Sequence, residues 1–191
     1  MTRNRLEAFS DGVIAILITI MVLELRTPEG VDLPALRPLL PAFATYLLSF
    51  VFLGIYWSNH HHMLHTVHRV TGGILWANLH LLFWLSLIPF VTGWLGVNHE
   101  AAIPTAAYGV VMLGSAIAYF VLQNVIIASQ GPGSPLRAAV GRDAKGKLST
   151  ALYVTAIAAA FVSPWIADAL FVIVALMWLV PDRRIEVLLR T

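Results

Sequence analysis

Cysteine is absent from this chain of 191 residues, and charged residues make up only 12% of it. Without cysteine there is no disulfide framework, no thiolate metal site and no cysteine nucleophile. Soluble domains carry about 25% charged residues, so this low content, together with 59% hydrophobic residues, excludes an ordinary soluble domain. A net charge of +2 from thinly spread basic residues also excludes a nucleic-acid-binding protein. The composition predicts an integral membrane protein.

Long apolar runs separated by polar segments predict six transmembrane helices. A membrane span needs roughly 20 apolar residues, and the candidates are Arg5–Leu25, Leu40–Met63, Thr71–Leu95, Pro104–Ala128, Leu148–Val162 and Pro164–Val180. The last two come from one stretch that is too long for a single span, so we expect a hairpin at the sequence SPWIAD, residues 163–168. The predicted fold class is all-α, with residues 1–191 forming a single six-helix transmembrane domain.

The placement of basic residues predicts the side of the membrane on which each loop lies. With six spans and a cytoplasmic N-terminus, ten of the twelve basic residues fall in cytoplasmic segments: Arg3, Arg5, Arg69, Arg137, Arg142, Lys145, Lys147, Arg183, Arg184 and Arg190. The outer segments hold only Arg26 and Arg37. Because cytoplasmic loops are enriched in Lys and Arg, we expect both termini in the cytoplasm. We also expect the polar, Gly-rich segment Gln130–Lys147 to be a cytoplasmic linker.

The first predicted span carries an apolar stripe along one side. Its sequence is RLEAFSDGVIAILITIMVLEL, residues 5–25. A helical wheel at about 100° per residue places Ile16, Ile20 and Leu23 together, with Thr19 beside them. Such a stripe is most often explained by contact with lipid or with neighbouring helices, so it does not define a function by itself.

Asp11 lies on a different side of the same helix, about 140° from Ile16. A carboxylate in lipid is costly, so Asp11 must face protein or water. We expect Asp11, with Ser10, to hold the helix against its neighbours, and an ion or proton site is the alternative.

Possible donors for Asp11 occur at the end of the second span and the start of the third, where an antiparallel hairpin brings them to its level. They are Trp57, Asn59, His60, His61, His62, His65, Asn78 and His80. Three helices are therefore expected to share one polar cluster.

The histidines in this cluster leave other interpretations open. His61 and His65 are four residues apart, and His68 follows three later, so the three imidazoles share a face if the helix continues. This spacing is compatible with metal binding. A membrane metalloenzyme is the less favoured reading because the cluster is single, and a pH sensor is a further alternative. We expect no catalytic residue, no structural metal and no cofactor.

Several sequence elements together resemble one family. Arg5-x-x-x-Phe9-Ser10-Asp11-Gly12-Val13, followed by Ala15-Ile16 and Thr19, is similar to the first helix of bacterial members of the transmembrane-protein-175 family of potassium channels. The stretches IYWSNHHHM and LWANLHLLFWLSLIPFVT agree with the second and third helices of that family. Ile14 is a departure, because many members have phenylalanine there.

The resemblance implies a potassium-selective, leak-type channel in the bacterial inner membrane. It implies a homotetramer whose central pore is lined by the first helix of each six-helix subunit, with potassium as a transient occupant. The constriction and selectivity positions carried over are Ile16, Thr19, Ile20 and Leu23. A helix-locking motif of Arg5, Phe9, Ser10 and Asp11 is implied to meet a supporting cluster of Trp57, His60, His61, His62 and Asn78. No TVGYG-like filter occurs in the chain, in keeping with an apolar constriction.

The main rival function is a proton-coupled secondary transporter that uses Asp11. It predicts an aqueous cavity at Asp11 and usually an internal repeat. The FSD sequence occurs only once in the chain, which disfavours this alternative.

Overall fold

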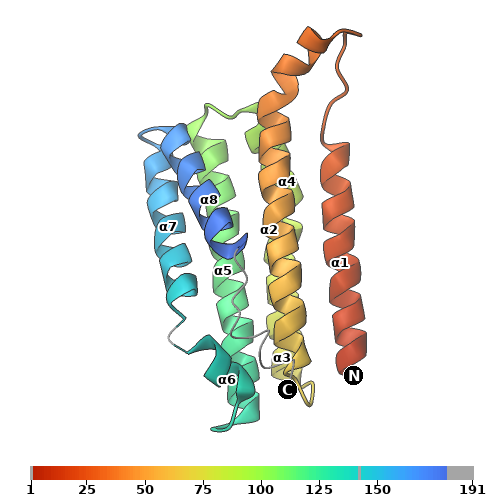
Figure 1. Ribbon diagram of the computed structural model, residues 1–191, viewed down its shortest axis with the longest axis vertical. Coiled ribbons are helices and arrows are strands. Elements are labelled where there is room, and N and C mark those ends of the chain that lie inside the picture. Colours follow the sequence, from red (N-terminus) through yellow and green to blue (C-terminus); the bar gives the residue numbers. More distant parts are fainter. Residues whose placement is uncertain (1, 142, 180–191) are drawn as a thin grey trace.

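The computed structural model describes residues 2–141 and 143–179, and the regular secondary structure of these residues is helical throughout. The elements are α1 (Arg3–Leu23), η1 (Leu33–Leu39), α2 (Leu40–His65), α3 (Gly72–Ser86), α4 (Ile88–Val97), α5 (Ala102–Gln130), α6 (Pro135–Val140), α7 (Ala144–Ala160) and α8 (Pro164–Leu179). The long helices stand side by side in a bundle (Figure 1). The predicted all-α class is confirmed.

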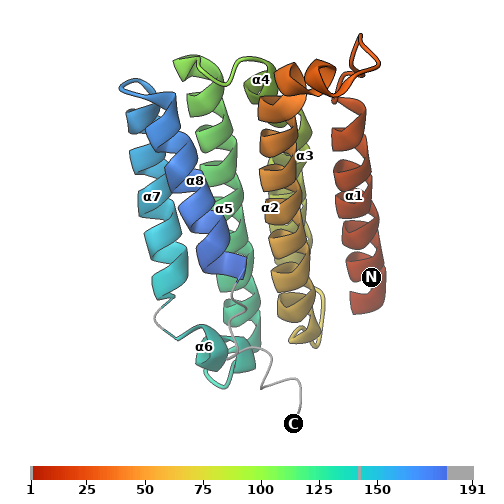
Figure 2. The same ribbon diagram turned by 45° about the horizontal axis from the view of Figure 1, so that its top comes forward.

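The first helix lies at one edge of this bundle. Figures 1 and 2 show α1 beside α2 at that edge, α7 and α8 at the opposite edge, and α5 between them. Within the chain, α1 contacts α2, α3 and α4. Its remaining side is covered by no other element of the described chain, and this arrangement sets up the candidate site.

Among the residues that the structure describes, four helical segments are long and apolar enough to cross a membrane: Arg3–Leu23, Leu33–His65, Gly72–Val97 and Ala102–Gln130. They correspond to the first four predicted spans. The predicted break near Pro164 is also confirmed, because α7 ends at Ala160 and α8 begins at Pro164. These two helices have 17 and 16 residues, or about 25 Å of length each. The predicted end of the last span, Val180, lies outside the described residues.

The third predicted span is interrupted at Leu87, between α3 and α4. Pro89 lacks a backbone N–H, and its ring clashes with a helical carbonyl four residues earlier. The Leu87 N–H consequently bonds the Trp84 carbonyl at 3.2 Å, in a tighter turn than an α-helix makes. Gly72–Val97 nevertheless remains one apolar helical segment.

The predicted linker Gln130–Lys147 is more ordered than expected, because it contains α6 and the beginning of α7. Side-chain caps explain both helix starts. Ser134 Oγ accepts a hydrogen bond from the Arg137 N–H at 3.2 Å, and Asp143 Oδ1 accepts one from the Gly146 N–H at 3.2 Å. Each cap satisfies a backbone donor that a helix end leaves unpaired.

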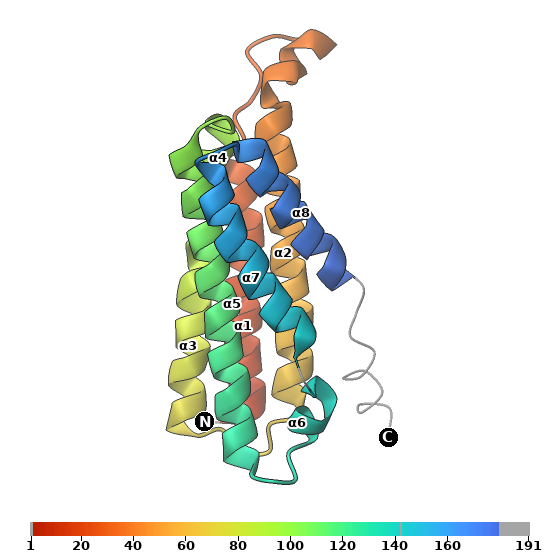
Figure 3. The same ribbon diagram turned by 90° about the vertical axis from the view of Figure 1, so that its left-hand side faces the viewer.

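The two ends of the bundle differ in charge. Figures 1 and 3 place the start of α1, the α2–α3 turn and α6 at one end, so this end carries Arg3, Arg5, Arg69 and Arg137, and Lys145 and Lys147 follow in the first turn of α7. The segments at the other end contain Glu24, Glu29, Asp32 and Glu100 with Arg26 and Arg37. Arg142, Arg183, Arg184 and Arg190, which were also expected in the cytoplasm, lie outside the described residues.

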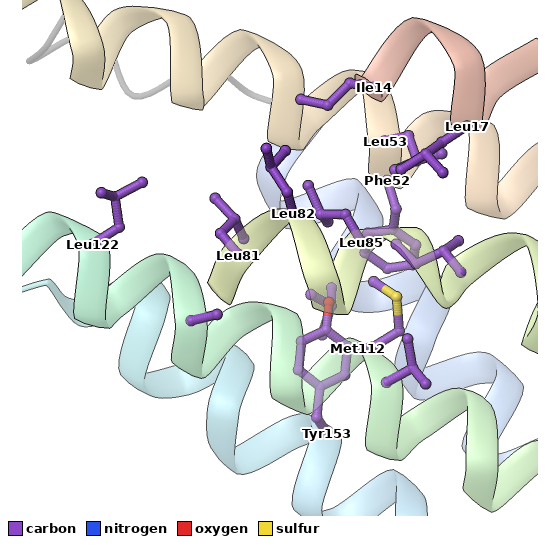
Figure 4. Packing of buried hydrophobic residues seen from close by; sticks show 14 of the residues in the cluster. Ile14, Leu17, Phe52, Leu53, Leu81, Leu82, Leu85, Met112, Leu122 and Tyr153 are labelled. Atoms are coloured by element: carbon purple, nitrogen blue, oxygen red, sulfur yellow. The ribbon is translucent and has the colours of Figure 1, made fainter. Parts of the chain in front are cut away.

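The core is a continuous apolar cluster drawn from the long helices. Figure 4 shows part of it, where the side chains of Ile14 and Leu17 lie among those of other helices. A buried hydroxyl triad joins α2, α4 and α5: Ser49 Oγ is 3.0 Å from the Tyr108 hydroxyl, and Thr92 Oγ1 donates to Ser49 Oγ at 2.7 Å. Interhelical hydrogen bonds of this kind stabilise membrane bundles.

Candidate functional site

The first helix has one buried and one uncovered side. Its buried residues are Leu6, Ser10, Ile14, Leu17 and Met21, and their spacing of three or four residues puts them on one face. On the other side, Ile16 is 57% exposed, Ile20 40% and Leu23 80%. These three residues and Thr19 are called the open face of α1 from here on. The predicted constriction residues therefore lie together, on a side that the described chain leaves uncovered.

The hydroxyl of Thr19 is oriented by its own helix. Thr19 Oγ1 donates a hydrogen bond to the Ile16 carbonyl at 2.9 Å. Because a hydroxyl has one donor hydrogen and two acceptor lone pairs, this bond leaves Oγ1 as an acceptor. An acceptor oxygen on an exposed side can receive a cation.

A buried hydrogen-bonded chain ties α1 to α2 and α3. Asn78 Nδ2 donates to Ser10 Oγ at 3.0 Å, and Ser10 Oγ donates to the Leu6 carbonyl at 2.9 Å. His60 Nε2 is 2.7 Å from Asn78 Oδ1, and since that amide oxygen can only accept, the proton lies on Nε2. Ser10, His60 and Asn78 are all fully buried. The structure thus brings together three of the residues that were predicted to hold the helices.

Asp11 lies at the seam between α1 and α2 rather than in that buried chain. It is half-buried, and its Oδ1 accepts a hydrogen bond from Trp57 Nε1 at 3.0 Å. The expectation that the histidines bond Asp11 is not met by the described hydrogen bonds. Asp11 points toward α2, and the carboxylate that faces the histidines is a different one.

That carboxylate belongs to Glu7, a residue outside the predicted site. Glu7 Oε1 is 2.7 Å from His61 Nδ1 and 3.4 Å from His65 Nε2. Arg3 Nη1 donates to the His65 carbonyl at 3.1 Å. Glu7 precedes Asp11 by four residues and so lies on the same face of α1. This spacing was the sequence signal that could have revealed it.

Two residues of the predicted locking motif lie apart from these contacts. Arg5 and Phe9 are exposed, and Phe9 retains half of its accessible surface. On the helical wheel both fall within about 20° of Ile16, on the side of the open face.

The remaining histidines also have distinct positions. The His62 ring lies 5.8 Å from that of His61, between centroids. His80 accepts a hydrogen bond from Trp84 Nε1 at 3.0 Å, on an exposed side of α3. Because α2 ends at His65, His68 lies outside the helix, so the condition for three imidazoles on one face, a helix that continues to His68, is not met.

The cavities described for the chain lie away from α1. One of about 330 Å³ is bounded by α2, α5, α7 and α8, with largely apolar and aromatic walls that include Phe52, Tyr56 and Tyr153. A second lies beside the α2–α3 turn and the end of α5. Neither cavity includes a residue of α1, so the aqueous pocket at Asp11 that coupled transport predicts is not found among them.

Residues 5–89 match the family described as endosomal/lysosomal potassium channel TMEM175. A protein described as a potassium channel from a Chryseobacterium species is 55% identical over 186 residues, covering 97% of each chain. Another potassium channel, from Streptomyces collinus, is 35% identical over 125 residues, covering 61% of this chain and 60% of that protein. The crystal structure of a lysosomal potassium-selective channel TMEM175 homologue from Chamaesiphon minutus superposes with a TM-score of 0.82 at 28% identity, covering 94% of this chain and 97% of that one.

Proposed function

Since this chain belongs to the TMEM175 family of potassium channels, we propose that it forms a potassium-selective, leak-type channel in the bacterial inner membrane. The family consists of channels rather than enzymes, in agreement with the sequence analysis. Family membership and several apolar helices make it a membrane protein. The finer features are proposed below from the geometry of α1.

We propose a homotetramer in which the open faces of four α1 helices surround a central pore. The observation that carries this proposal is that Ile16, Ile20 and Leu23 are exposed together, on a different side of the helix from its well-packed face. A single chain offers no cavity along α1 among those described. A path lined by the exposed side of this helix can form between copies of the chain, and a symmetric ring is the usual closed arrangement of identical subunits.

The constriction in this proposal is apolar. Rings of Ile16, Ile20 and Leu23 side chains would offer an ion no ligand to replace its water, so a narrow passage between them gates by dewetting. Potassium holds its hydration water less tightly than sodium does. A ring of Thr19 hydroxyl oxygens, each already donating its hydrogen to the Ile16 carbonyl, adds acceptors that favour the ion that sheds water more readily.

The polar contacts on the other side of α1 hold this helix in a fixed rotation. The buried chain through Ser10, Asn78 and His60 and the bond from Trp57 to Asp11 join α1 to both α2 and α3. Rotation of α1 would break these bonds, and the buried groups of Ser10, Asn78 and His60 would then be left unpaired in a low-dielectric region, which is costly. We assign the Ser10–Asp11 region the role of directing the open face toward the pore.

The proposed topology has six crossings, with both termini in the cytoplasm and residues 1–191 in one transmembrane domain. It is supported by the gathering of basic residues at the end of the bundle that holds the start of α1. The lengths of α7 and α8, about 25 Å each, are below the roughly 30 Å of a typical hydrocarbon core. Local thinning of the bilayer accommodates helices of this length.

The test is ion flux into liposomes that contain the purified protein. We expect potassium-driven flux that exceeds sodium-driven flux and that needs no pH gradient. Flux of potassium and sodium at equal rates contradicts selectivity. Flux that appears only with a pH gradient, and disappears in Asp11→Asn, supports the transporter alternative instead.

A further inference from the structure

The first turns of α1 and the last turn of α2 bring three metal-binding side chains together. From each of Glu7, His61 and His65, one ligand atom lies within 4.8 Å of the ligand atoms of the other two. His61 Nδ1 and His65 Nε2 both face Glu7 Oε1, at 2.7 and 3.4 Å, and the two rings are 4.4 Å apart between centroids. We propose that these three side chains form a site for an exchangeable divalent transition-metal ion of the zinc class.

The donor set suits such an ion. Zinc takes imidazole nitrogen and carboxylate oxygen at about 2.0–2.2 Å in tetrahedral geometry. Two ligand atoms of a tetrahedral site with such bonds are roughly 3.3 Å apart. The separation of 3.4 Å between Glu7 Oε1 and His65 Nε2 already fits. The separation of 2.7 Å between Glu7 Oε1 and His61 Nδ1 is shorter, and a small rotation of the Glu7 side chain would widen it to admit the ion.

The site is accessible from one side and closed on the other. The Glu7 side chain is 14% exposed, whereas His61 is 41% and His65 35% exposed. An ion can therefore enter past the imidazoles and meet a largely buried carboxylate. Three protein ligands leave the fourth position to water, which is typical of zinc sites that exchange a ligand.

Among the described residues, the charged side chains beside the cluster are one guanidinium and one further carboxylate, and neither is bonded to a ligand atom of the site. Arg3, the basic residue beside the cluster, directs Nη1 to the His65 backbone carbonyl rather than to Glu7. Asp11 lies one turn further along the same face and is held by Trp57. Its negative charge therefore lies near the site without occupying a ligand position.

An ion at this site would connect α1 to α2, because Glu7 comes from α1 and both histidines come from α2. This consequence rests on the proposed function, in which α1 lines the pore. Binding would hold the cytoplasmic end of α1 against α2 and oppose any motion of α1 that widens the constriction. The site would then act as an inhibitory clamp.

The binding test uses tag-free, full-length protein in detergent, with Co²⁺ as a spectroscopic probe and Zn²⁺ in calorimetric titration. We expect one equivalent of Co²⁺ per chain, with the visible absorption of tetrahedral coordination. Glu7→Gln, which keeps the shape and hydrogen-bonding capacity of the side chain, should weaken binding by about tenfold or more. His61→Gln should do the same, whereas His68→Gln, an exposed histidine beyond the end of α2, should bind like the parent protein.

Binding of Co²⁺ by Glu7→Gln and His61→Gln as tightly as by the parent protein overturns the proposal, as does absence of binding in the parent protein. Elution on size exclusion at the parent volume selects variants that have folded, and either variant alone is sufficient for the comparison.

Potassium flux into liposomes, with and without Zn²⁺ on the side of His61, distinguishes the proposed metal site from the proposed channel function. Metal binding without potassium flux leaves the site intact and contradicts the proposed function. Potassium flux that Zn²⁺ slows in the parent protein but not in Glu7→Gln supports the channel function and the inhibitory role of the metal site. Potassium flux on which Zn²⁺ has no effect overturns the inhibitory role.

Discussion

Ile14 and Ile16, two residues apart on α1, lie on opposite sides of the helix: Ile14 is fully buried, and Ile16 is 57% exposed. Two residues correspond to a rotation of about 200° around an α-helix. These two isoleucines therefore have different roles: Ile14 packs α1 against its neighbours, and Ile16 is proposed to line the pore.

Ile16→Asn is expected to raise potassium conductance and to weaken the preference for potassium over sodium. An amide in the constriction holds water, so the barrier to passage falls for hydrated potassium and for hydrated sodium. Single-channel conductance and reversal potentials in planar bilayers measure the two effects. Ile14→Asn is the matched control and should lower the yield of folded protein instead, because a buried amide without a partner costs about 1–3 kcal/mol. Unchanged conductance and reversal potential in Ile16→Asn would rule out a constriction at this residue.

Asn78→Ala is expected to destabilise the protein by about 1–3 kcal/mol without changing ion preference. The substitution leaves the buried groups of Ser10 and His60 without their shared partner. Thermal unfolding and the yield of assembled protein on size exclusion measure the loss. Asn124→Ala is the control, because Asn124 is exposed and its side chain donates to the Phe120 carbonyl of its own helix. Equal stability of the two variants would contradict a structural role for the buried chain.

Asp11→Ala is expected to harm assembly more than selectivity, through loss of the hydrogen bond from Trp57. Asp11→Asn keeps an acceptor oxygen and should remain close to the parent protein. A double-mutant cycle with Trp57→Phe should show that the two residues share one interaction, worth about 1 kcal/mol. A well-assembled Asp11→Ala protein with altered ion preference would instead assign Asp11 to ion handling.

Gly114→Ala is expected to destabilise the contact between α5 and α3. A Cβ at this position would lie 2.3 Å from the Trp84 ring, whose indole is held by its bond to His80. Gly54→Ala is the control, because a Cβ there meets nothing within 4 Å in the described chain. Alanine also favours a helix over glycine by about 1 kcal/mol. Thermal unfolding should therefore shift downward for Gly114→Ala and stay level or rise for Gly54→Ala, and the reverse order would contradict the packing described for α5.

The long apolar segments could be predicted from the sequence because lipid imposes length and hydropathy directly on a helix. The start of α2 at Leu40 and the break before Pro164 follow from proline positions. The interruption at Leu87 was missed, although Pro89 causes it, because membrane helices often tolerate proline and the run of apolar residues continues through it. Helix α6 was missed because a short, polar helix has no hydrophobic period, and its formation depends on local capping by Ser134.

The two faces of α1 could be predicted because helical rotation is fixed by geometry, and the exposure of Ile16 and the burial of Ser10 agree with it. Partners across helices could not be predicted, since they depend on how α1 and α2 are offset along their axes. The offset places Glu7, not Asp11, beside His61. The locking role of Arg5 and Phe9 was taken from the family motif. The helical wheel instead places both residues on the side of the open face.

The claim that the open face of α1 lines the pore is tested most directly by cysteine accessibility. The chain contains no cysteine, so an introduced cysteine is the single reactive thiol. Leu23 and Val22 are neighbours on α1, 80% and 47% exposed, yet they point about 100° apart. A thiol-reactive cation should block the potassium current of Leu23→Cys and leave that of Val22→Cys unchanged. Block of Val22→Cys alone, or equal block of both variants, would contradict a pore lined by the open face of α1.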